Sequence, residues 1–434
     1  MKQVFFILLA FSLTILFSCQ TKQKEAGQKE AAPSPKTNSI SKISDEVYYN
    51  KVLGMLVGSA IGDAMGAPTE MWNRKNIQIE YGFVSDLDTM VRFPSAEGTW
   101  KYNLPAGGTT DDTRWKKLFV KYALEEPWPD LRADHFANHI TENYKADIQS
   151  LKSTEGFQPG PYEENLMKMA WLQEWAIVAD AYSKNNMTTY ADALSKFYGG
   201  EMTCAGMLYS PVVGACVPAD PLNAYQTAYD LAIFDNGYAR DITALIAAMV
   251  SQAFTANAEK PSIINVVRTI DPKEYFKSRL VGRASYRFYQ IANSIVSESK
   301  ELTLKDKDIN FKIPREWQPM DSLTYLQFSH AYTLLDKFNQ DMPFHSAEIY
   351  LITITAMMYS DYDFEKTMEF IINYGRDNDT VAAVAGAILG AYWGVDHLPE
   401  KKVKQVLKVN KELLDNDLEN LALTIKNKYV QEKD

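Results

Sequence analysis

Two short acidic segments carry the residue types best suited to chemistry in this chain of 434 residues. They are Thr110-Asp111-Asp112-Thr113 and Asp377-Asn378-Asp379-Thr380, and each opens an apolar stretch with helical spacing. Mg²⁺ and similar hard cations prefer carboxylate and hydroxyl oxygens, with some coordination positions kept by water or substrate. Two aspartates and a threonine from each segment would supply such a ligand set. We therefore expect the two segments to form the halves of one divalent-metal site, provided that the fold brings them together.

A structural alternative applies to each segment taken alone. Threonine is a favoured N-cap residue, and carboxylates in the first turn complement the helix dipole. This alternative is weaker for the second segment, because residues 379–393 are apolar almost all round and predict a buried helix. Asp377 and Asp379 at the start of a buried helix would be costly charges unless they were paired or bound to metal. Four carboxylates close together would repel one another, which favours two metal ions.

The elements that must position these acids are predicted to be helices nearly throughout, with breaks at Gly and Pro clusters and no convincing series of alternating strands. We expect a single all-α domain over residues 44–434, with polar excursions near 141–163 and 300–325. Apolar residues recur every three or four positions in 45–65, 113–125, 164–182, 241–254, 346–359 and 379–393.

The first of these helices carries Gly54, Gly58 and Gly62 at four-residue spacing. Glycine is poor in an exposed helix, so a row of glycines on one face predicts close approach by another backbone. A membrane helix dimer is the alternative reading of this stripe. The packing interpretation is favoured, because the segment contains Asp63 and follows a polar tether.

The N-terminus predicts an export signal. Lys2 followed by the apolar run of residues 4–17 is typical of a signal peptide, and the run is too short to span a bilayer comfortably. It ends in Leu16-Phe17-Ser18-Cys19, which resembles the lipobox at which bacterial lipoproteins are cleaved and acylated on the new N-terminal cysteine. We predict a lipid anchor at Cys19, a disordered tether over 20–43 and a body held at the cell envelope facing the periplasm. The alternative is an ordinary secretory signal with Cys19 incidental.

The composition excludes few classes of protein, but it limits the kinds of binding partner that we expect. The formal net charge of −10 and the lack of clustered Lys and Arg argue against nucleic acid. No later run is long and apolar enough to cross a membrane, so we expect membrane contact through the anchor only. Cys204 and Cys216 could pair outside the cytoplasm, but two cysteines do not make a disulfide framework. We expect a monomer.

Three motifs stand out in the chain, GSAIGDAMGAPTE at 58–70, TTDDTR at 109–114 and YGRDNDTVAAVAGAILGAYWG at 374–394. Together they resemble the ADP-ribosylglycohydrolase family. The resemblance implies an orthogonal all-helical fold with two Mg²⁺ ions, which Mn²⁺ could replace, in a cleft that holds a terminal ribose. It also implies that Glu70 acts as a ligand or gate near the metals. The metal ligands that it implies are Thr110, Asp111, Asp112, Asp377, Asp379 and Thr380.

The implied reaction is hydrolysis of an N- or O-glycosidic bond at the anomeric carbon of ribose, in an ADP-ribosyl or related riboside. Metal-bound ribose hydroxyls would orient the sugar, and Asp111 or Asp112 could accept the proton of the attacking water. We assign catalytic roles to Asp111, Asp112 and Glu70. The sequence does not distinguish a metal ligand from a base.

The loop expected to contact the rest of the substrate departs from the family pattern. In residues 203–211 Met207 and Pro211 match, but Leu208 stands where the family has Arg. A family Thr-His pair is replaced within residues 232–241. The metal ligands are unaffected by these changes, whereas the ADP-ribosyl contacts are altered. From these two stretches we expect substrate contacts by Gly206, Met207, Tyr209, Asp235 and Tyr238.

Three functions fit these observations. The first is an Mg²⁺-dependent glycohydrolase that cleaves a riboside, and the retained acids favour it. The second is a catalytically altered binding or structural protein on the same fold, because fold alone does not guarantee catalysis. The third is a two-metal phosphoesterase, which a clamp of Arg and Lys around the metals would favour. The motifs show only Arg114 and Arg376 near the acids.

Overall fold

The computed structural model describes residues 43–91, 103–153, 166, 168–308, 311–318 and 320–433. The signal peptide and Cys19 lie outside the described residues, as does nearly all of the tether, so the lipid anchor stays a prediction. Within the described ranges, no helix combines the length and apolarity needed to cross a membrane.

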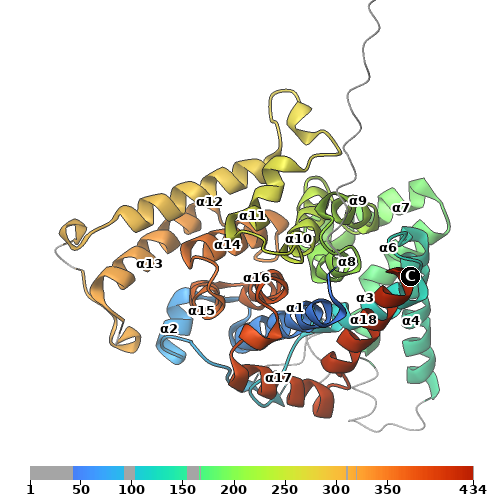
Figure 1. Cartoon of the computed structure of the whole chain (residues 1–434), viewed down its shortest axis with the longest axis horizontal. Helices are drawn as coiled ribbons and strands as arrows, with labels where there is room; N and C mark the ends of the chain where they lie inside the picture. The colour runs from blue at the N-terminus through green and yellow to red at the C-terminus, as the bar shows by residue number, and fades with distance from the viewer. Residues whose placement is uncertain are drawn as a thin grey trace, which may run out of the picture. The chain divides into compact units, whose positions relative to one another are not determined.

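The all-α prediction is confirmed, because helices make up most of the described chain (Figure 1). Four two-residue strands occur among these residues, β1 (Trp72–Asn73), β2 (Met90–Val91), β3 (Asn103–Leu104) and β4 (Gly375–Arg376). The α-helices are α1 Asp45–Gly66, α2 Arg74–Glu80, α3 Asp111–Glu125, α4 Ala133–Ser153, α6 Gln173–Ser183, α7 Met187–Leu194, α8 Ser210–Cys216, α9 Pro221–Leu231, α10 Ala239–Ala253, α11 Lys260–Thr269, α12 Ala284–Glu301, α13 Ser322–Leu335, α14 Ser346–Tyr359, α15 Phe364–Tyr374, α16 Asn378–Trp393, α17 Glu400–Leu413 and α18 Leu418–Lys433.

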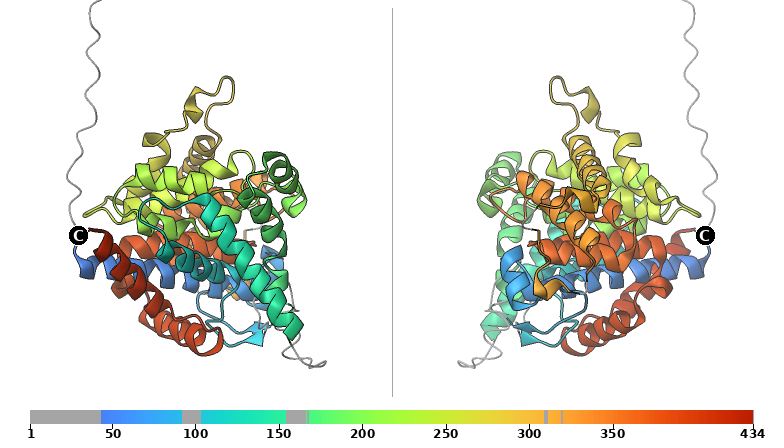
Figure 2. Two further views of the ribbon diagram at one scale, coloured as in Figure 1. Left: turned by 90° about the vertical axis from the view of Figure 1, so that its right-hand side faces the viewer. Right: turned by 90° about the vertical axis from the view of Figure 1, so that its left-hand side faces the viewer.

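Helices α1 and α16 lie side by side at the centre of the described residues (Figures 1 and 2). Helices α15, α10 and α14 pack on α16, while α18, α17 and α3 pack on α1. Nearly every residue of α16 and most of α1 are buried, as the apolar character of both segments predicts. This central pair joins the two motifs that lie farthest apart in the sequence.

The glycine stripe of α1 makes this central pair possible, and the predicted close backbone approach is confirmed. A Cβ built on Gly58 would lie 2.4 Å from the carbonyl oxygen of Gly386, and one built on Gly386 would lie 2.1 Å from that of Gly58. A Cβ on Gly54 would lie 2.3 Å from the carbonyl oxygen of Gly390. The two backbones therefore touch where any side chain would separate them.

A short antiparallel ladder between β1 and β4 ties together the chain segments that flank the acids. Trp72 pairs with Arg376, and the Met71 amide donates to the Arg376 carbonyl at 2.8 Å. Met71 and Arg376 both adopt left-handed backbone, with φ of 65° and 68°. Such conformations cost free energy in residues other than glycine and are often found at functional sites. Here they lie directly beside Glu70 and Asp377.

The remaining sequence expectations agree with the structure in part. Cys204 and Cys216 are both buried and unpaired. The polar stretch from 141 does not leave the bundle at once, because α4 continues through Ser153 and residues 154–165 lie outside the described part. Helix α12 ends at Glu301 and α13 begins at Ser322, so most of the predicted excursion near 300–325 lies between these two helices.

Candidate metal centre and pocket

The start of α3 is anchored to α1 by a buried carboxylate. Asp63 accepts hydrogen bonds from the amide of Thr110 at 2.9 Å and the amide of Thr113 at 3.0 Å. The Thr113 hydroxyl donates to the same carboxylate at 2.5 Å. Thr110 is also the N-cap of α3, because its hydroxyl accepts from the Asp112 amide at 3.4 Å. The capping interpretation is therefore correct for this segment, but it is not the whole role of these residues.

The two acidic segments meet, and they exchange hydrogen bonds. The Thr380 hydroxyl donates to Asp112 Oδ2 at 3.0 Å, and the Thr110 hydroxyl lies 3.4 Å from Asp379 Oδ2. Each threonine thus bonds to an aspartate of the opposite segment. This crossed arrangement brings the N-termini of α3 and α16 to a common point, although the segments are 269 residues apart in the chain.

Glu70 completes the cluster from the end of the first motif. Carboxylate oxygens of Glu70, Asp377 and Asp379 all lie within 4.8 Å of one another. Such a spacing fits carboxylates that share a cation, because a divalent ion bound at about 2 Å from each oxygen would lie between them. Glu70 follows α1, Asp377 is the N-cap of α16 and Asp379 lies in its first turn, and the β1–β4 ladder ties these two parts of the chain together.

The electrostatics of this cluster favour a bound cation. Burial, followed by repulsion from Glu70, raises the pKa of Asp377 to about 7. Burial also raises the pKa of Asp112 and of Asp379 well above the ordinary range. The buried Lys116 donates to the carbonyl oxygen of Asp112 at 2.9 Å, but burial lowers its own pKa. These carboxylates would ionise far more readily beside a metal ion.

The surroundings of two carboxylate oxygens indicate whether these residues fit a bound metal. Asp112 Oδ1 and Asp379 Oδ1 are both buried, and neither has a hydrogen-bond donor among the described residues. A buried carboxylate oxygen without a donor is costly. Because both atoms belong to residues that already touch the opposite segment, they fit the role of cation ligands. The prediction that the two segments come together is confirmed, whereas the ligand roles themselves stay predictions.

The acids line a pocket of about 260 Å³. Its polar lining includes Glu70, Asp111, Asp112, Asp377, Asp379 and Thr380. The rest of its lining is mainly apolar and includes Met71, Trp175, Tyr198, Cys204, Leu208 and Phe344. Small-molecule sites usually combine apolar side chains with a few polar groups in this way.

None of the five residues expected to contact substrate is among the described residues that line this pocket, and their role as substrate contacts stays a prediction. Met207 and Tyr209 are fully buried, and the Tyr209 hydroxyl donates to the Leu231 carbonyl at 2.9 Å within the core. The carboxylate of Asp235 accepts a hydrogen bond from the Gly206 amide at 3.0 Å. Asp235 therefore holds the backbone of this loop in place through a buried contact.

Tyr238 is half-buried, and its ring packs near Phe288 and His345. The pocket is instead lined by neighbours of the expected residues, namely Thr203, Cys204, Ala205 and Leu208. The short helix Ala205–Leu208 turns Met207 inward and Leu208 toward the pocket.

Sequence reasoning missed several residues that shape the site. Asp63 was noted only as a charge in an apolar helix, although an isolated carboxylate among buried glycines is itself a signal of a polar partner. Trp175, Tyr198 and Phe344 belong to segments with no motif, and only the fold brings them to the pocket. No local pattern in the sequence would have identified these three aromatic residues.

The fold and site define an all-helical protein with a buried cluster of carboxylates at the junction of two helix N-termini. The chain belongs to the ADP-ribosylglycohydrolase family, whose profile matches residues 44–433. Members of this family are generally hydrolases of glycosidic bonds and typically use divalent metals. The family resemblance of the three motifs is thereby confirmed.

The relatives are distant in sequence. An uncharacterized protein of Archaeoglobus fulgidus is 22% identical over 349 residues, which cover 80% of this chain and 88% of the relative. The uncharacterized protein YegU of Escherichia coli is 22% identical over 347 residues, with the same coverage of 80% and 88%. Human ADP-ribosylhydrolase ARH3 is 50% identical over 36 residues, which are 8% of this chain and 10% of that protein.

A solved structure shares the fold. It is described as an ADP-ribosylglycohydrolase-related protein complex, and it superposes with a TM-score of 0.52 at 16% identity. The match covers 88% of this chain and 99% of that chain. At this identity the likeness shows the fold alone.

Proposed function

We propose that this protein is an Mg²⁺-dependent hydrolase of an N- or O-glycosidic bond to ribose. The observation that carries the proposal is the crossed pair of hydrogen bonds between the acidic segments. These bonds join Thr380 to Asp112 and Thr110 to Asp379. Thr380, Asp112 and Asp379 line a pocket together with Glu70. A scaffold protein has no physical need for so many buried carboxylates at one point. The residues proposed to hold two Mg²⁺ ions are Glu70, Thr110, Asp111, Asp112, Asp377, Asp379 and Thr380.

When bound, the ions would orient the ribose hydroxyls and stabilise negative charge near the reacting centre. The chain itself supplies the proton acceptor. Asp111 is half-buried and lines the pocket, so its carboxylate is accessible to water beside the sugar. The bond from the anomeric carbon to the leaving group breaks with its electron pair on the leaving group. Water forms the new C–O bond and its proton passes to the carboxylate.

The test combines turnover with metal binding. We expect Mg²⁺-dependent release of ribose or ADP-ribose from at least one member of a panel of ADP-ribosyl-arginine, ADP-ribosyl-serine, O-acetyl-ADP-ribose and simple ribosides. Asp112→Asn should lose turnover by about a hundredfold or more and bind Mg²⁺ more weakly, because removing one ligand charge weakens a hard-cation site.

Asp321→Asn is the matched control, because Asp321 is also an acid at a helix start but lies exposed as the cap of α13. The control should behave as the unaltered protein. Absence of Mg²⁺ binding together with absence of turnover on the whole panel would refute the proposal.

We also propose that the protein is lipid-anchored at the cell envelope through Cys19. The support is the apolar run of residues 4–17 and the lipobox-like Leu16-Phe17-Ser18-Cys19. We expect the full chain to be recovered with membranes and to incorporate labelled fatty acid, and Cys19→Ala to lose the label. Fatty-acid labelling that persists in the Cys19→Ala chain would contradict the anchor at this residue.

A further inference from the structure

The loop of residues 270–283, between α11 and α12, presents apolar side chains to solvent. It projects beyond these two helices in every view (Figures 1 and 2). Leu280 is 97% exposed, the most of any large apolar residue that the structure describes, and the adjacent Val281 is 65% exposed. Phe276 of the same loop is also exposed. Single exposed apolar side chains are normal on protein surfaces, but a group of them on one projecting loop indicates an interaction site.

The loop is fixed to the body at both ends. The carboxylate of Asp271 accepts hydrogen bonds from the amides of Tyr275 and Phe276, both at 2.9 Å. At the other end Arg283 is buried and pairs with the buried Asp241 of α10 at 2.7 Å. The apolar side chains between these two ends are therefore held out from the body by a built structure.

The backbone of Leu280 is unusual for an exposed leucine. Its φ is 79°, in the left-handed region, and the Gly282 amide donates to the Ser278 carbonyl at 2.9 Å to close the turn around it. This conformation costs free energy in residues other than glycine. Because the side chain of Leu280 is almost fully exposed, packing within the chain does not offset that cost. Such outliers are often found at functional positions.

Positive charge is concentrated in the same part of the chain. Between residues 268 and 287 the exposed basic residues are Arg268, Lys273, Lys277, Arg279 and Arg287, and the acids are Asp271 and Glu274. These basic residues outnumber the acids by three, in a chain whose formal net charge is −10. Apolar side chains flanked by Lys and Arg match the surface of an anionic bilayer, where negative headgroups cover the acyl chains.

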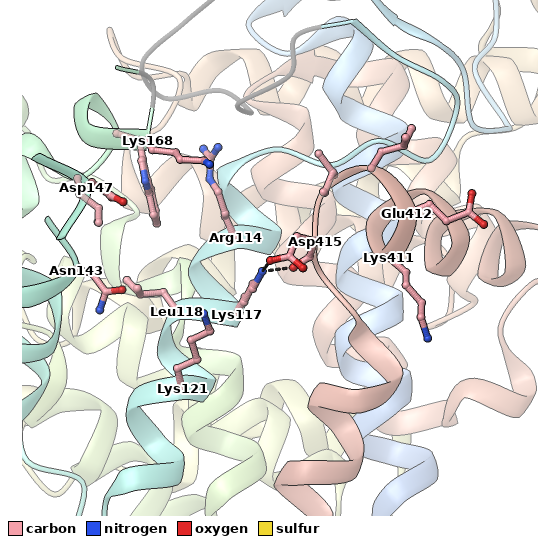
Figure 3. A pocket seen from close by; sticks show the side chains of 14 residues that line it. Arg114, Lys117, Leu118, Lys121, Asn143, Asp147, Lys168, Lys411, Glu412 and Asp415 are labelled. Atoms are coloured by element: carbon pink, nitrogen blue, oxygen red, sulfur yellow. Dashed lines mark hydrogen bonds and ion pairs between the residues drawn. The ribbon is translucent and has the colours of Figure 1, made fainter. Parts of the chain in front are cut away.

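Another group of basic residues in the described part of the chain lacks this form. A cavity of about 590 Å³ beside α3 is lined by Arg114, Lys117, Lys121, Lys168 and Lys411 (Figure 3). Asp147, Glu412 and Asp415 line the same cavity, and Lys117 pairs with Asp415 at 3.3 Å. A concave surface with interspersed acids cannot enter a bilayer as a projecting apolar loop can.

The predicted lipid anchor would keep the loop within reach of a membrane. As a flexible chain, the predicted tether of residues 20–43 would span roughly 25–30 Å. A tether of this length raises the effective concentration of the body at the surface, so that even weak contacts become populated. The tether alone does not determine which face of the body meets the membrane.

We infer that the loop of residues 270–283 docks on an anionic phospholipid surface. Leu280 and Val281 enter the headgroup region, and the flanking basic residues face the lipid phosphates. This inference goes beyond the proposed function, and it adds a second contact to the lipid anchor, which was the only membrane contact expected from the sequence. None of residues 270–283, all of which the structure describes, lines the acidic pocket.

The test measures whether residue 280 enters the bilayer. The full chain carrying Leu280→Cys is labelled with an environment-sensitive fluorophore and mixed with vesicles of phosphatidylglycerol and phosphatidylcholine in equal parts, which also contain a spin-labelled lipid that quenches fluorescence inside the bilayer. Cys204 and Cys216 are buried, and the unaltered protein gives the background from Cys19. We expect a blue shift and quenching of the label at residue 280.

The matched control is Ile79→Cys with the same label. Ile79 is an aliphatic residue of α2 that is 62% exposed, so the label is equally accessible there but lies outside the loop. The label at residue 79 should show neither the blue shift nor the quenching. Labels at 280 and 79 that behave alike on these vesicles would overturn the inference.

A pair of charge reversals tests the role of the basic residues. Arg279→Glu, in the chain labelled at 280, should lower the ratio of docked to free loop, taken from the quenched fraction, by about tenfold or more. Lys121→Glu makes the same charge change at an exposed residue of the cavity in Figure 3 and should leave the ratio unchanged. Vesicles of phosphatidylcholine alone should give a low ratio for every chain.

Two further outcomes would also overturn the inference. One is an equal effect of Arg279→Glu and Lys121→Glu. The other is a blue shift at residue 280 that appears without lipid and grows with protein concentration, because it would assign the loop to contact between copies of this chain. Quenching at 280 that depends on both Arg279 and the anionic lipid supports the inference, whatever the outcome of the turnover assays.

Discussion

The close contact between α1 and α16 offers a matched pair of substitutions that separates fold stability from metal binding. A Cβ on Gly54 would lie 2.3 Å from the Gly390 carbonyl oxygen, and a Cβ on Gly66 would lie 2.3 Å from the Cα of Asp379. The two clashes are equally tight, but Gly54 and Gly66 stand about 18 Å apart along α1, at a rise of about 1.5 Å per residue. Neither glycine has a positive φ, so alanine is not excluded by the backbone itself.

The magnitude follows from the geometry. Ordinary van der Waals contact begins at 3.4 Å, so either alanine must move its neighbour by about 1 Å (3.4 minus 2.3). Overpacking of this kind costs about 1–3 kcal/mol, and the better helix propensity of alanine returns up to about 1 kcal/mol. At Gly66 the displaced neighbour is a proposed ligand, and Mg²⁺ tolerates shifts of only about 0.2 Å at its oxygens. We therefore expect Gly66→Ala alone to weaken Mg²⁺ binding, by about tenfold or more.

The assay is calorimetric Mg²⁺ titration beside urea unfolding without metal. Both variants should lose about 1–2 kcal/mol of unfolding free energy, and Gly54→Ala should keep the affinity of the unaltered protein. Equal Mg²⁺ affinity in the two variants would refute the placement of Asp379 at the metal. Unchanged stability in both would refute the close packing of α1 and α16.

Two further predictions concern the buried charges. Asp63→Ala should lower the unfolding free energy by about 2–5 kcal/mol, because the amides of Thr110 and Thr113 lose their acceptor. Urea unfolding measures this loss. A variant as stable as the unaltered protein would contradict the anchoring role of Asp63. The second concerns pH. The folded-state pKa of Asp377 is about 7 against an ordinary 3.8, so its favourable contribution to metal-free stability is complete below about pH 4 and is lost as pH rises through about 7, a change on the order of 4 kcal/mol. Mg²⁺ binds the ionised form, so stabilisation by Mg²⁺ in thermal unfolding should grow between pH 5 and 8, and a constant effect over that range would contradict this.

The parts of this structure that the sequence predicts are those encoded locally. Helix periodicity, the four-residue spacing from Gly54 to Gly62 and the threonine-acid helix starts each reflect neighbours within a turn or two. The meeting of the two acidic segments is non-local. It is nevertheless predictable, because each segment is incomplete as a ligand set and the second would be costly alone.

The aromatic residues that line the pocket could not be predicted in the same way. Trp175, Tyr198 and Phe344 come from three segments that only tertiary packing brings together. Each of these aromatic residue types is found in a hydrophobic core as readily as in a binding pocket. The position of Tyr209 in the core was unforeseen for a related reason. Leu208 and Tyr209 are adjacent, and the phase of one short 3₁₀ turn decides which of them faces the pocket. An apolar residue was overlooked there because aromatic side chains are the more obvious partners for a base or sugar.

The backbone and the side chains of this site favour ligands of opposite charge. Two helix N-termini that converge would by themselves attract an anion, because their amides and dipoles present positive charge. At the start of α3, the amides of Thr110 and Thr113 donate hydrogen bonds to the buried carboxylate of Asp63. The side chains of Asp112 and Asp379 lie at this junction, where they accept hydrogen bonds from Thr380 and Thr110. The proposed preference of the junction for a cation over an anion therefore rests on its acidic side chains and not on the two helix ends.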